Sequence, residues 1–238
     1  MKYLVSLLFG LTVAGLIWWQ IDYFKRTTKN ARIERKILRQ DLNRILENKS
    51  LKPGQPVFIR IFKQSSELEL WMQKSDKFVH VKTYPICKWS GKLGPKLKQG
   101  DKQSPEGFYT VSKSQLNPNS KYHLSFNLGY PNRFDRSHKR SGDFLMVHGS
   151  CVSIGCYAIT NAGISEVYRL AASALASGQS KFAVHIFPFR MNQDTLNKYK
   201  SHKWHSFWQS LKPAYDWFEE HKTIPKVRVK NKAYVISG

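Results

Sequence analysis

One short stretch, residues 144–163, holds the residues of this chain best suited to nucleophilic catalysis. It contains His148 and two of the chain's three cysteines, Cys151 and Cys156. A cysteine nucleophile needs a nearby base, access to solvent and donors for the developing oxyanion. His148 follows an apolar run and offers the base. Cys156 follows Gly155, where the backbone can approach a substrate closely because glycine has no side chain.

The same residues also allow a structural interpretation. His148 can be a packed histidine at the end of a strand, with the cysteines as small core residues. Outside the cytoplasm, Cys151 and Cys156 could form a disulfide, since the segment between them is long enough to close, and Cys87 would then be left alone. If the two do not pair, Cys151 is the rival nucleophile.

Hydrophobic periodicity predicts the elements that position this stretch. The apolar run at 144–148 predicts a strand that ends at the histidine. Residues 161–176 carry apolar side chains at helical spacing, with Asn161 as the N-cap and Gly178 after the last turn. If this helix directs its N-terminus at the turn carrying Cys156, its dipole favours a thiolate there.

The rest of the chain predicts a mainly β fold with a few helices (α+β). Alternating apolar and polar residues at 57–62, 68–73 and 78–84 predict a meander of antiparallel strands. A loop rich in glycine and lysine follows at 88–107, and loops of this length are often functional. We also expect strands at 107–112, 123–129 and 182–187, and an amphipathic helix at 204–221.

The N-terminal residues predict a membrane anchor. Residues 3–19 carry no charge, so we expect an uncleaved signal anchor at 1–24. A basic connecting helix is expected at 25–51, and one domain with a C-terminal helical extension at 52–238. More positive residues follow the anchor than precede it, which predicts that its C-terminal side faces the cytoplasm. A buried core helix is the other interpretation of the apolar segment.

The charge balance of the chain is strongly basic. Its 238 residues include 39 Lys and Arg but 16 Asp and Glu, a formal net charge of +23. Such a surface favours a polyanionic partner, whether nucleic acid, anionic lipid or an acidic wall polymer. The sequence has no zinc-type cysteine spacing, no phosphate-binding glycine loop and no RNA-binding aromatic signature. We therefore expect no nucleic-acid partner, although a basic nucleic-acid binder remains an alternative on charge alone.

The stretch resembles the catalytic domain of the L,D-transpeptidases, the YkuD-like family. In that family a strand ending in His-Gly is followed by Ser/Thr-His-Gly-Cys, then by an Arg two residues later and an Asn further on. The matching residues here are His148-Gly149, Ser153-Ile154-Gly155-Cys156 and Asn161, and residues 104–109 (SPEGFY) resemble the family's upstream Thr-Pro-x-Gly-x-Phe/Tyr segment. The resemblance covers roughly residues 57–190.

The chain departs from the family pattern in three features, and in these features it resembles the YafK-like branch of the family. The gap between His148 and Ser153 is shorter than usual, Ile154 replaces the second histidine, and Ala158 replaces the arginine. That branch includes a protein that hydrolyses a link between peptidoglycan and protein. These departures leave transpeptidation open, whereas Cys-His acyl chemistry is retained.

The resemblance implies a β-sandwich catalytic domain that needs no metal or organic cofactor. Cys156 would attack the carbonyl at the diaminopimelate centre of a peptidoglycan stem peptide and form a thioester, with His148 as the base. Ser153 and Gly155 would hold the oxyanion turn. The domain would lie in the periplasm, anchored in the inner membrane. Its partners would be stem peptides and, for a hydrolase, wall-attached protein.

Three further residues are weaker candidates for substrate binding. Tyr122 and Asn127 could line the groove, although an alternating strand gives the same pattern. Arg190 could replace the missing arginine as a carboxylate partner, or be a structural residue. The functional alternatives are a hydrolase that releases protein from peptidoglycan by the same chemistry, and an inactive module that binds the wall.

Overall fold

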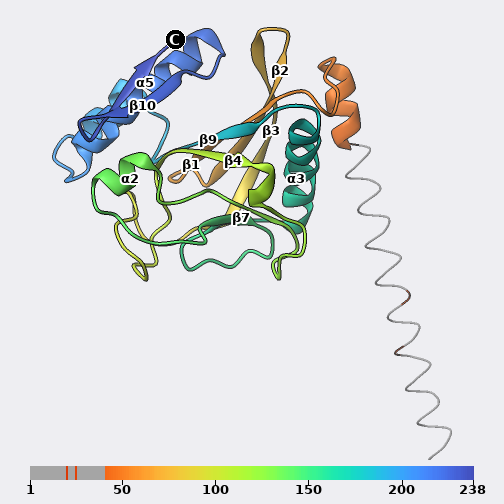
Figure 1. Ribbon diagram of the computed structural model, residues 1–238, viewed down its shortest axis with the longest axis horizontal. Coiled ribbons are helices and arrows are strands. Elements are labelled where there is room, and N and C mark those ends of the chain that lie inside the picture. Colours follow the sequence, from red (N-terminus) through yellow and green to blue (C-terminus); the bar gives the residue numbers. More distant parts are fainter. Residues whose placement is uncertain (1–19, 21–24, 26–40) are drawn as a thin grey trace, which may run out of the picture. The chain divides into compact units, whose positions relative to one another are not determined.

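The computed structural model describes residues 20, 25 and 41–238 (Figure 1). Residues Ile45–Gly238 form one compact unit, which contains every strand of the described residues. Apart from residues 20 and 25, the predicted anchor at 1–24 and most of the connecting helix lie outside the described residues; residues 41–48 are helical. None of the helices in the described part is both long and apolar enough to cross a membrane.

Within the described residues, nine strands form one sheet in the order β4-β9-β1-β2-β3-β8-β7-β6-β5. Their bounds are β1 (Val57–Phe62), β2 (Glu67–Lys74), β3 (Lys77–Lys88), β4 (Gly107–Ser112), β5 (Leu116–Asn117), β6 (Ser125–Asn127), β7 (Met146–His148), β8 (Tyr157–Ile159) and β9 (Lys181–Phe187). The mainly β architecture is confirmed. The strands of the expected sandwich join into one continuous ladder, because β3 pairs with β2 on one side and with β8 on the other.

The first three strands form the predicted antiparallel meander. All six residues of β1 are buried, and β1 pairs antiparallel with β2 and parallel with β9. Side chains on both faces of β1 are therefore covered. The strand was predicted, but VFIRIF is apolar at every position except Arg60 instead of alternating, because both of its faces are buried.

The short strands β6, β7 and β8 determine which side chains share a face. Ser125 pairs with His148 across β6 and β7, and His148 pairs with Ala158 across β7 and β8. Successive side chains alternate between the two faces of a sheet. The other face of these strands carries apolar side chains that are fully buried, namely Phe126, Val147 and Tyr157. Burial of that face directs His148 to the opposite one.

Helix α3 (Asn161–Ala176) has the predicted bounds but a different cap. The N-cap is Thr160, whose Oγ1 accepts a hydrogen bond from the Gly163 N–H at 3.0 Å, so the prediction of Asn161 as the cap was wrong. Asn161 Oδ1 instead accepts a hydrogen bond from the Ser150 N–H at 2.9 Å. Asn161 therefore supports the loop that follows β7.

The long loop at 88–107 is held by one buried lysine. Lys63 Nζ donates hydrogen bonds of 2.9–3.0 Å to three carbonyl oxygens of the loop, those of Lys92, Gly94 and Ser104. It also pairs with Glu106 at 3.1 Å, and both side chains are fully buried. Glu106 in turn accepts a hydrogen bond from Trp208 Nε1 at 2.8 Å. The loop is long, but its course is fixed by satisfied buried groups.

The remaining elements are short helices and a C-terminal hairpin. The helices are η1 (Lys113–Gln115), α2 (Arg133–Ser137), α4 (Gln193–Lys198) and α5 (His205–His221), of which only α5 was expected. The hairpin pairs β10 (Lys226–Lys230) with β11 (Ala233–Ser237) and lies beside α5 (Figure 1).

Candidate active site

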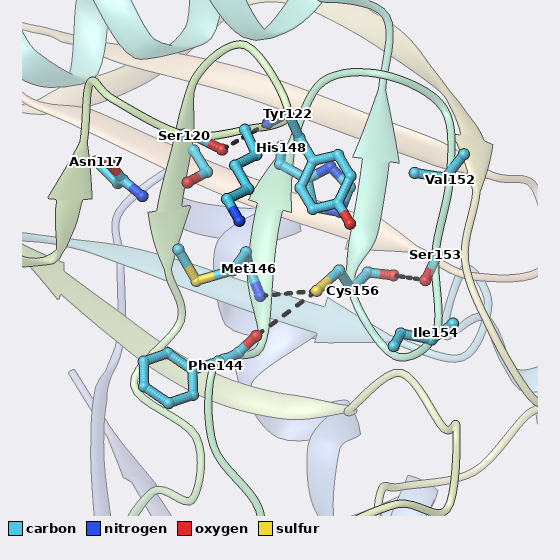
Figure 2. Close-up of a pocket in the computed structure, with 12 residues that line it drawn as sticks. Asn117, Ser120, Tyr122, Phe144, Met146, His148, Val152, Ser153, Ile154 and Cys156 are labelled. Atoms are coloured by element: carbon cyan, nitrogen blue, oxygen red, sulfur yellow. Dashed lines mark hydrogen bonds between the residues drawn. The ribbon is translucent and has the colours of Figure 1, made fainter.

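A cavity of about 480 Å³ opens over the strands β6, β7 and β8 (Figure 2). Its lining combines residues of β5, β6 and β7 with the segments that precede β6, β7 and β8. The lining residues are Asn117, Ser120, Lys121, Tyr122, Ser125, Phe144, Met146, His148, Val152, Ser153, Ile154 and Cys156. The cavity thus contains both members of the predicted Cys-His pair.

His148 is buried at the end of β7, and its ring is oriented by a backbone carbonyl. Its Nδ1 lies 2.6 Å from the carbonyl oxygen of Gly149. A carbonyl can only accept, so Nδ1 carries the proton and Nε2 keeps its lone pair. Burial lowers the pKa of His148, and the bond to Gly149 offsets this in part. At neutral pH the ring is therefore an uncharged base.

Gly149 allows the chain to approach its neighbours closely at this point. Its N–H donates to the carbonyl oxygen of Tyr122 at 3.0 Å. A Cβ at this position would lie 2.8 Å from that oxygen and 2.4 Å from Asn161 Oδ1, which real side chains do not tolerate. The His-Gly sequence is thus explained by the packing around the strand end.

Cys156 is the free cysteine among the described residues, and its sulfur lies between two backbone groups (Figure 2). Its Sγ accepts from the Met146 N–H at 3.4 Å and lies 3.6 Å from the carbonyl oxygen of Phe144. Burial raises the pKa of the thiol, although the Met146 amide and the charge of Lys96 act in the opposite direction. The raised pKa favours a neutral thiol in the resting site over the thiolate that a helix dipole would favour.

The turn before Cys156 is built from serine hydroxyls. Ser153 Oγ donates to the carbonyl oxygen of Cys156 at 2.8 Å and accepts from the Gly155 N–H at 3.1 Å. Ser90 Oγ lies 2.8 Å from Ser153 Oγ, and Ser104 Oγ donates to the same Cys156 carbonyl at 3.0 Å. Gly155 has a φ of +151°, a conformation that favours glycine. The turn is thereby fastened to the loop at 88–107.

A disulfide joins Cys87, near the end of β3, to Cys151 in the loop after β7. The Cα atoms are 5.3 Å apart and the two residues are separated by 64 positions. The expected alternative of a Cys151–Cys156 disulfide was therefore wrong. Cys151 is also not a rival nucleophile in this state, because its sulfur is already bonded. The loop after His148 is held twice, by this disulfide and by Asn161 at Ser150.

Of the weaker candidates, the structure brings only Tyr122 to the cavity. Its ring lies 4.7 Å from the ring of His148, at an interplanar angle of 31° (Figure 2). Asn127 Oδ1 accepts from the Gly129 N–H at 2.9 Å, outside the lining. Arg190 is bound to Glu67 at 2.7 Å and to Glu69 at 2.9 Å, so its charge is used within the protein.

Four residues that shape the cavity were not predicted as site residues, although Ile154 belongs to the motif. Lys121 is the one charged side chain in the lining, within the part of the chain that is described. Phe144 and Ile154 are 73% and 81% exposed at its rim, and Ser125 lines it beside His148. Phe144 and Ile154 lie beside or within the motif in the sequence, which was the available signal for these two. The place of Ser125 depends on strand register, which the sequence does not reveal.

The described residues contain no group of three or more His, Cys, Asp or Glu side chains that could hold a metal ion.

Comparisons with known proteins identify relatives of the chain. It is 47% identical over 184 residues, 77% of this chain and 75% of the relative, to the protein named "Putative L,D-transpeptidase YafK" in Escherichia coli strain K12, and equally to its counterpart in strain O157:H7. No protein-family model matches.

Similar solved structures are more distant. The helical cell shape determining protein Pgp2 of Campylobacter jejuni is 17% identical, with a TM-score of 0.45 and 80% of each chain covered. The K307A mutant of Pgp2 is 18% identical, with a TM-score of 0.47 and with 74% of this chain and 63% of that chain covered. Bd1075 of Bdellovibrio bacteriovorus is 18% identical, with a TM-score of 0.40 and with 78% of each chain covered. On the strength of the 47% identity, the chain belongs to the L,D-transpeptidase family, in its YafK branch.

Proposed function

We propose that this protein acts on peptidoglycan stem peptides through a thioester on Cys156, with His148 as the general base. One observation carries the proposal: the free thiol of Cys156, directly before β8, and the imidazole of His148 on the neighbouring β7, whose Nδ1 is bonded to Gly149, line the same cavity. A buried neutral pair of this kind suits a thiol that is deprotonated only as it attacks.

The reaction would proceed in two steps, and in each step His148 takes up one proton and releases it again. In the first, Cys156 Sγ attacks the peptide carbonyl while Nε2 takes the thiol proton, and the leaving amine then receives that proton as the C–N bond breaks. In the second, an acceptor gives its proton to Nε2 and attacks the thioester, and the sulfur recovers the proton as the C–S bond breaks. The Gly155 N–H is engaged by Ser153, so we assign the oxyanion to the Cys156 amide.

The cavity suits a substrate that carries a carboxylate. Lys121 supplies a positive charge to the lining, and no acidic residue lines it in the described structure. Ala158 replaces the family's arginine and Arg190 is occupied elsewhere, so Lys121 is the cation we propose for the substrate carboxylate. Water as the acceptor gives a hydrolase that releases wall-attached protein, and an amine gives a transpeptidase.

The disulfide supports a location outside the cytoplasm. Structural disulfides form and persist in oxidising compartments such as the periplasm. The Cys87–Cys151 bond therefore favours a periplasmic domain held by an N-terminal anchor over the cytoplasmic orientation that the flanking charges predict. We propose this location together with the activity.

Mass spectrometry of muropeptides would test the proposal. Wall material with and without attached protein is incubated with the full chain, with Cys156→Ala, and with the exposed control Ser114→Ala. Protein release by the wild type and the control, but not by Cys156→Ala, indicates a hydrolase. New crosslinks with loss of a terminal D-Ala indicate a transpeptidase. If no substrate changes and Cys156 gains no acyl mass, an inactive wall-binding module becomes the better account.

A further inference from the structure

Ser125 carries a buried hydroxyl without a hydrogen-bond partner at the wall of the cavity. Its side chain is 1% exposed and it lines the cavity, but its Oγ makes no hydrogen bond within the described structure. Three other buried side-chain atoms there share this condition, on Glu166, His185 and His205, and none of these residues lines the cavity. Buried polar groups are almost always paired, so an unpaired one at a site suggests a bound partner.

The sheet places Ser125 directly beside the proposed base. Ser125 on β6 is the registered partner of His148 on β7, and side chains of such a pair project from the same face about 4.5–5.5 Å apart. Cys156 precedes β8, on the other side of β7. His148 thus lies between the nucleophile and the hydroxyl. A group held by Ser125 can reach Nε2 without displacing the thiol.

We propose that Ser125 binds the acyl acceptor during the second step, an inference that rests on the proposed function. Water and a primary amine each carry at least two hydrogens. One is donated to His148 Nε2 and transferred to it, while the second is donated to Ser125 Oγ and stays on the acceptor. This arrangement aims the acceptor's lone pair at the thioester carbon. As the acceptor–carbon bond forms and the C–S bond breaks, Cys156 recovers the proton from His148.

This role predicts a change in one step only. Removal of the hydroxyl should leave formation of the thioester unchanged and slow its breakdown by about 10- to 100-fold, the scale expected for a misplaced reactant. Because the hydroxyl makes no bond within the described fold, its removal should not lower thermal stability. A structural serine would show the opposite pattern, with loss of stability and equal loss of both steps.

The experiment compares the full chain as wild type, Ser125→Ala, Ser125→Thr and Ser114→Ala. Intact-protein mass spectrometry measures the fraction of Cys156 that carries the acyl group during turnover of a stem-peptide substrate. Alkylation of Cys156 by iodoacetamide and the melting temperature are measured alongside. We expect the acyl-enzyme to accumulate in Ser125→Ala, with unchanged alkylation and stability. Ser125→Thr keeps the hydroxyl and should restore part of the turnover, and Ser114→Ala should match the wild type.

The possible failures are distinguishable. If Ser125→Ala turns over like the wild type without acyl accumulation, or if it loses folding and thiol reactivity together, the role of Ser125 is refuted while the thioester mechanism stands. If the wild type itself neither turns over nor gains acyl mass, the proposed function is overturned, and the inference about Ser125 is overturned with it.

Discussion

Two buried histidines on strands of the same sheet differ in what surrounds their rings. His148 on β7 and His185 on β9 are 2% and 3% exposed, and burial lowers the pKa of each. The His148 ring donates to Gly149 and lines the cavity with Cys156. The His185 ring packs edge-on against Phe58 and Phe108 at 4.8 and 4.7 Å, and its Nδ1 has no partner in the described structure.

Burial and a shifted pKa are therefore not sufficient to identify a catalytic histidine. His185 has the larger shift, to about 3, because full burial and the nearby charge of Arg60 both disfavour its protonated form. In the described structure its ring contacts are with phenylalanines, Phe58, Phe108 and Phe187. His148 has a fixed tautomer, an available second nitrogen and the thiol of Cys156 in the same cavity, and these geometric features make it the candidate base.

The largest expected effect is on activity, and it separates the two histidines. His148→Ala removes the base and should lower kcat/KM on stem-peptide substrates by about 10²- to 10⁴-fold. His185→Phe replaces a ring that packs among phenylalanines and should leave kcat/KM essentially unchanged. Steady-state kinetics with both variants checks this. Comparable losses in the two variants would mean that the cavity does not distinguish them and that His148 is not the base.

The sequence distinguishes these histidines only in part. MVHGS and AVHIF both predict strands, but a glycine ends the first while Ile186 and Phe187 continue the second. The 16-residue helix α3 was predictable from its helical period, and the short strand β1 from its run of apolar residues, because their own side chains specify them. The three-residue β8 and the Cys87–Cys151 pairing were not, since both depend on strands that are distant in sequence. The β10–β11 hairpin did have a signal, the alternation in KVRVK and AYVIS.

The second prediction concerns the covalent support of the His148 loop. The double variant Cys87→Ser/Cys151→Ser should lose about 2–4 kcal/mol of unfolding free energy, because the disulfide restricts the unfolded chain. Guanidinium unfolding measures the loss, with Cys156→Ser as a control that removes a thiol without removing the crosslink. Hydrogen exchange should quicken more at residues 149–156 than in β9. Equal quickening in both regions would show that the disulfide serves the whole fold rather than the loop.

A third prediction concerns the contribution of His185 to stability at acidic pH. Its folded pKa of about 3 lies below the ordinary unfolded value near 6.5, so unfolding takes up a proton between these limits. The contribution of neutral His185 is complete above pH 6.5 and is lost as the pH falls towards 3, by up to about 1.4 kcal/mol per unit. Urea unfolding at several pH values should show a shallower pH dependence for His185→Phe than for the wild type. Coincident slopes would contradict the assignment.

The smallest expected effect is the influence of His148 on the resting thiol. Burial raises the pKa of Cys156 and lowers that of His148, and both shifts favour the neutral thiol and neutral imidazole over an ion pair. Because Cys87 and Cys151 are bonded to each other, iodoacetamide in the native protein reports on Cys156. Its rate should rise with pH through a single midpoint above about 8.5, the ordinary cysteine value, and His148→Ala should alter it little.

An alkylation plateau extending below neutral pH, abolished by His148→Ala, would instead reveal a preformed thiolate–imidazolium pair. His148 would then stabilise a charge in the resting enzyme and act as an acid before it acts as a base. The contrast with His185 would persist, since His185 faces no thiol. The difference between the two histidines would then be caused by the electrostatic coupling between His148 and Cys156, and not by the available nitrogen of His148.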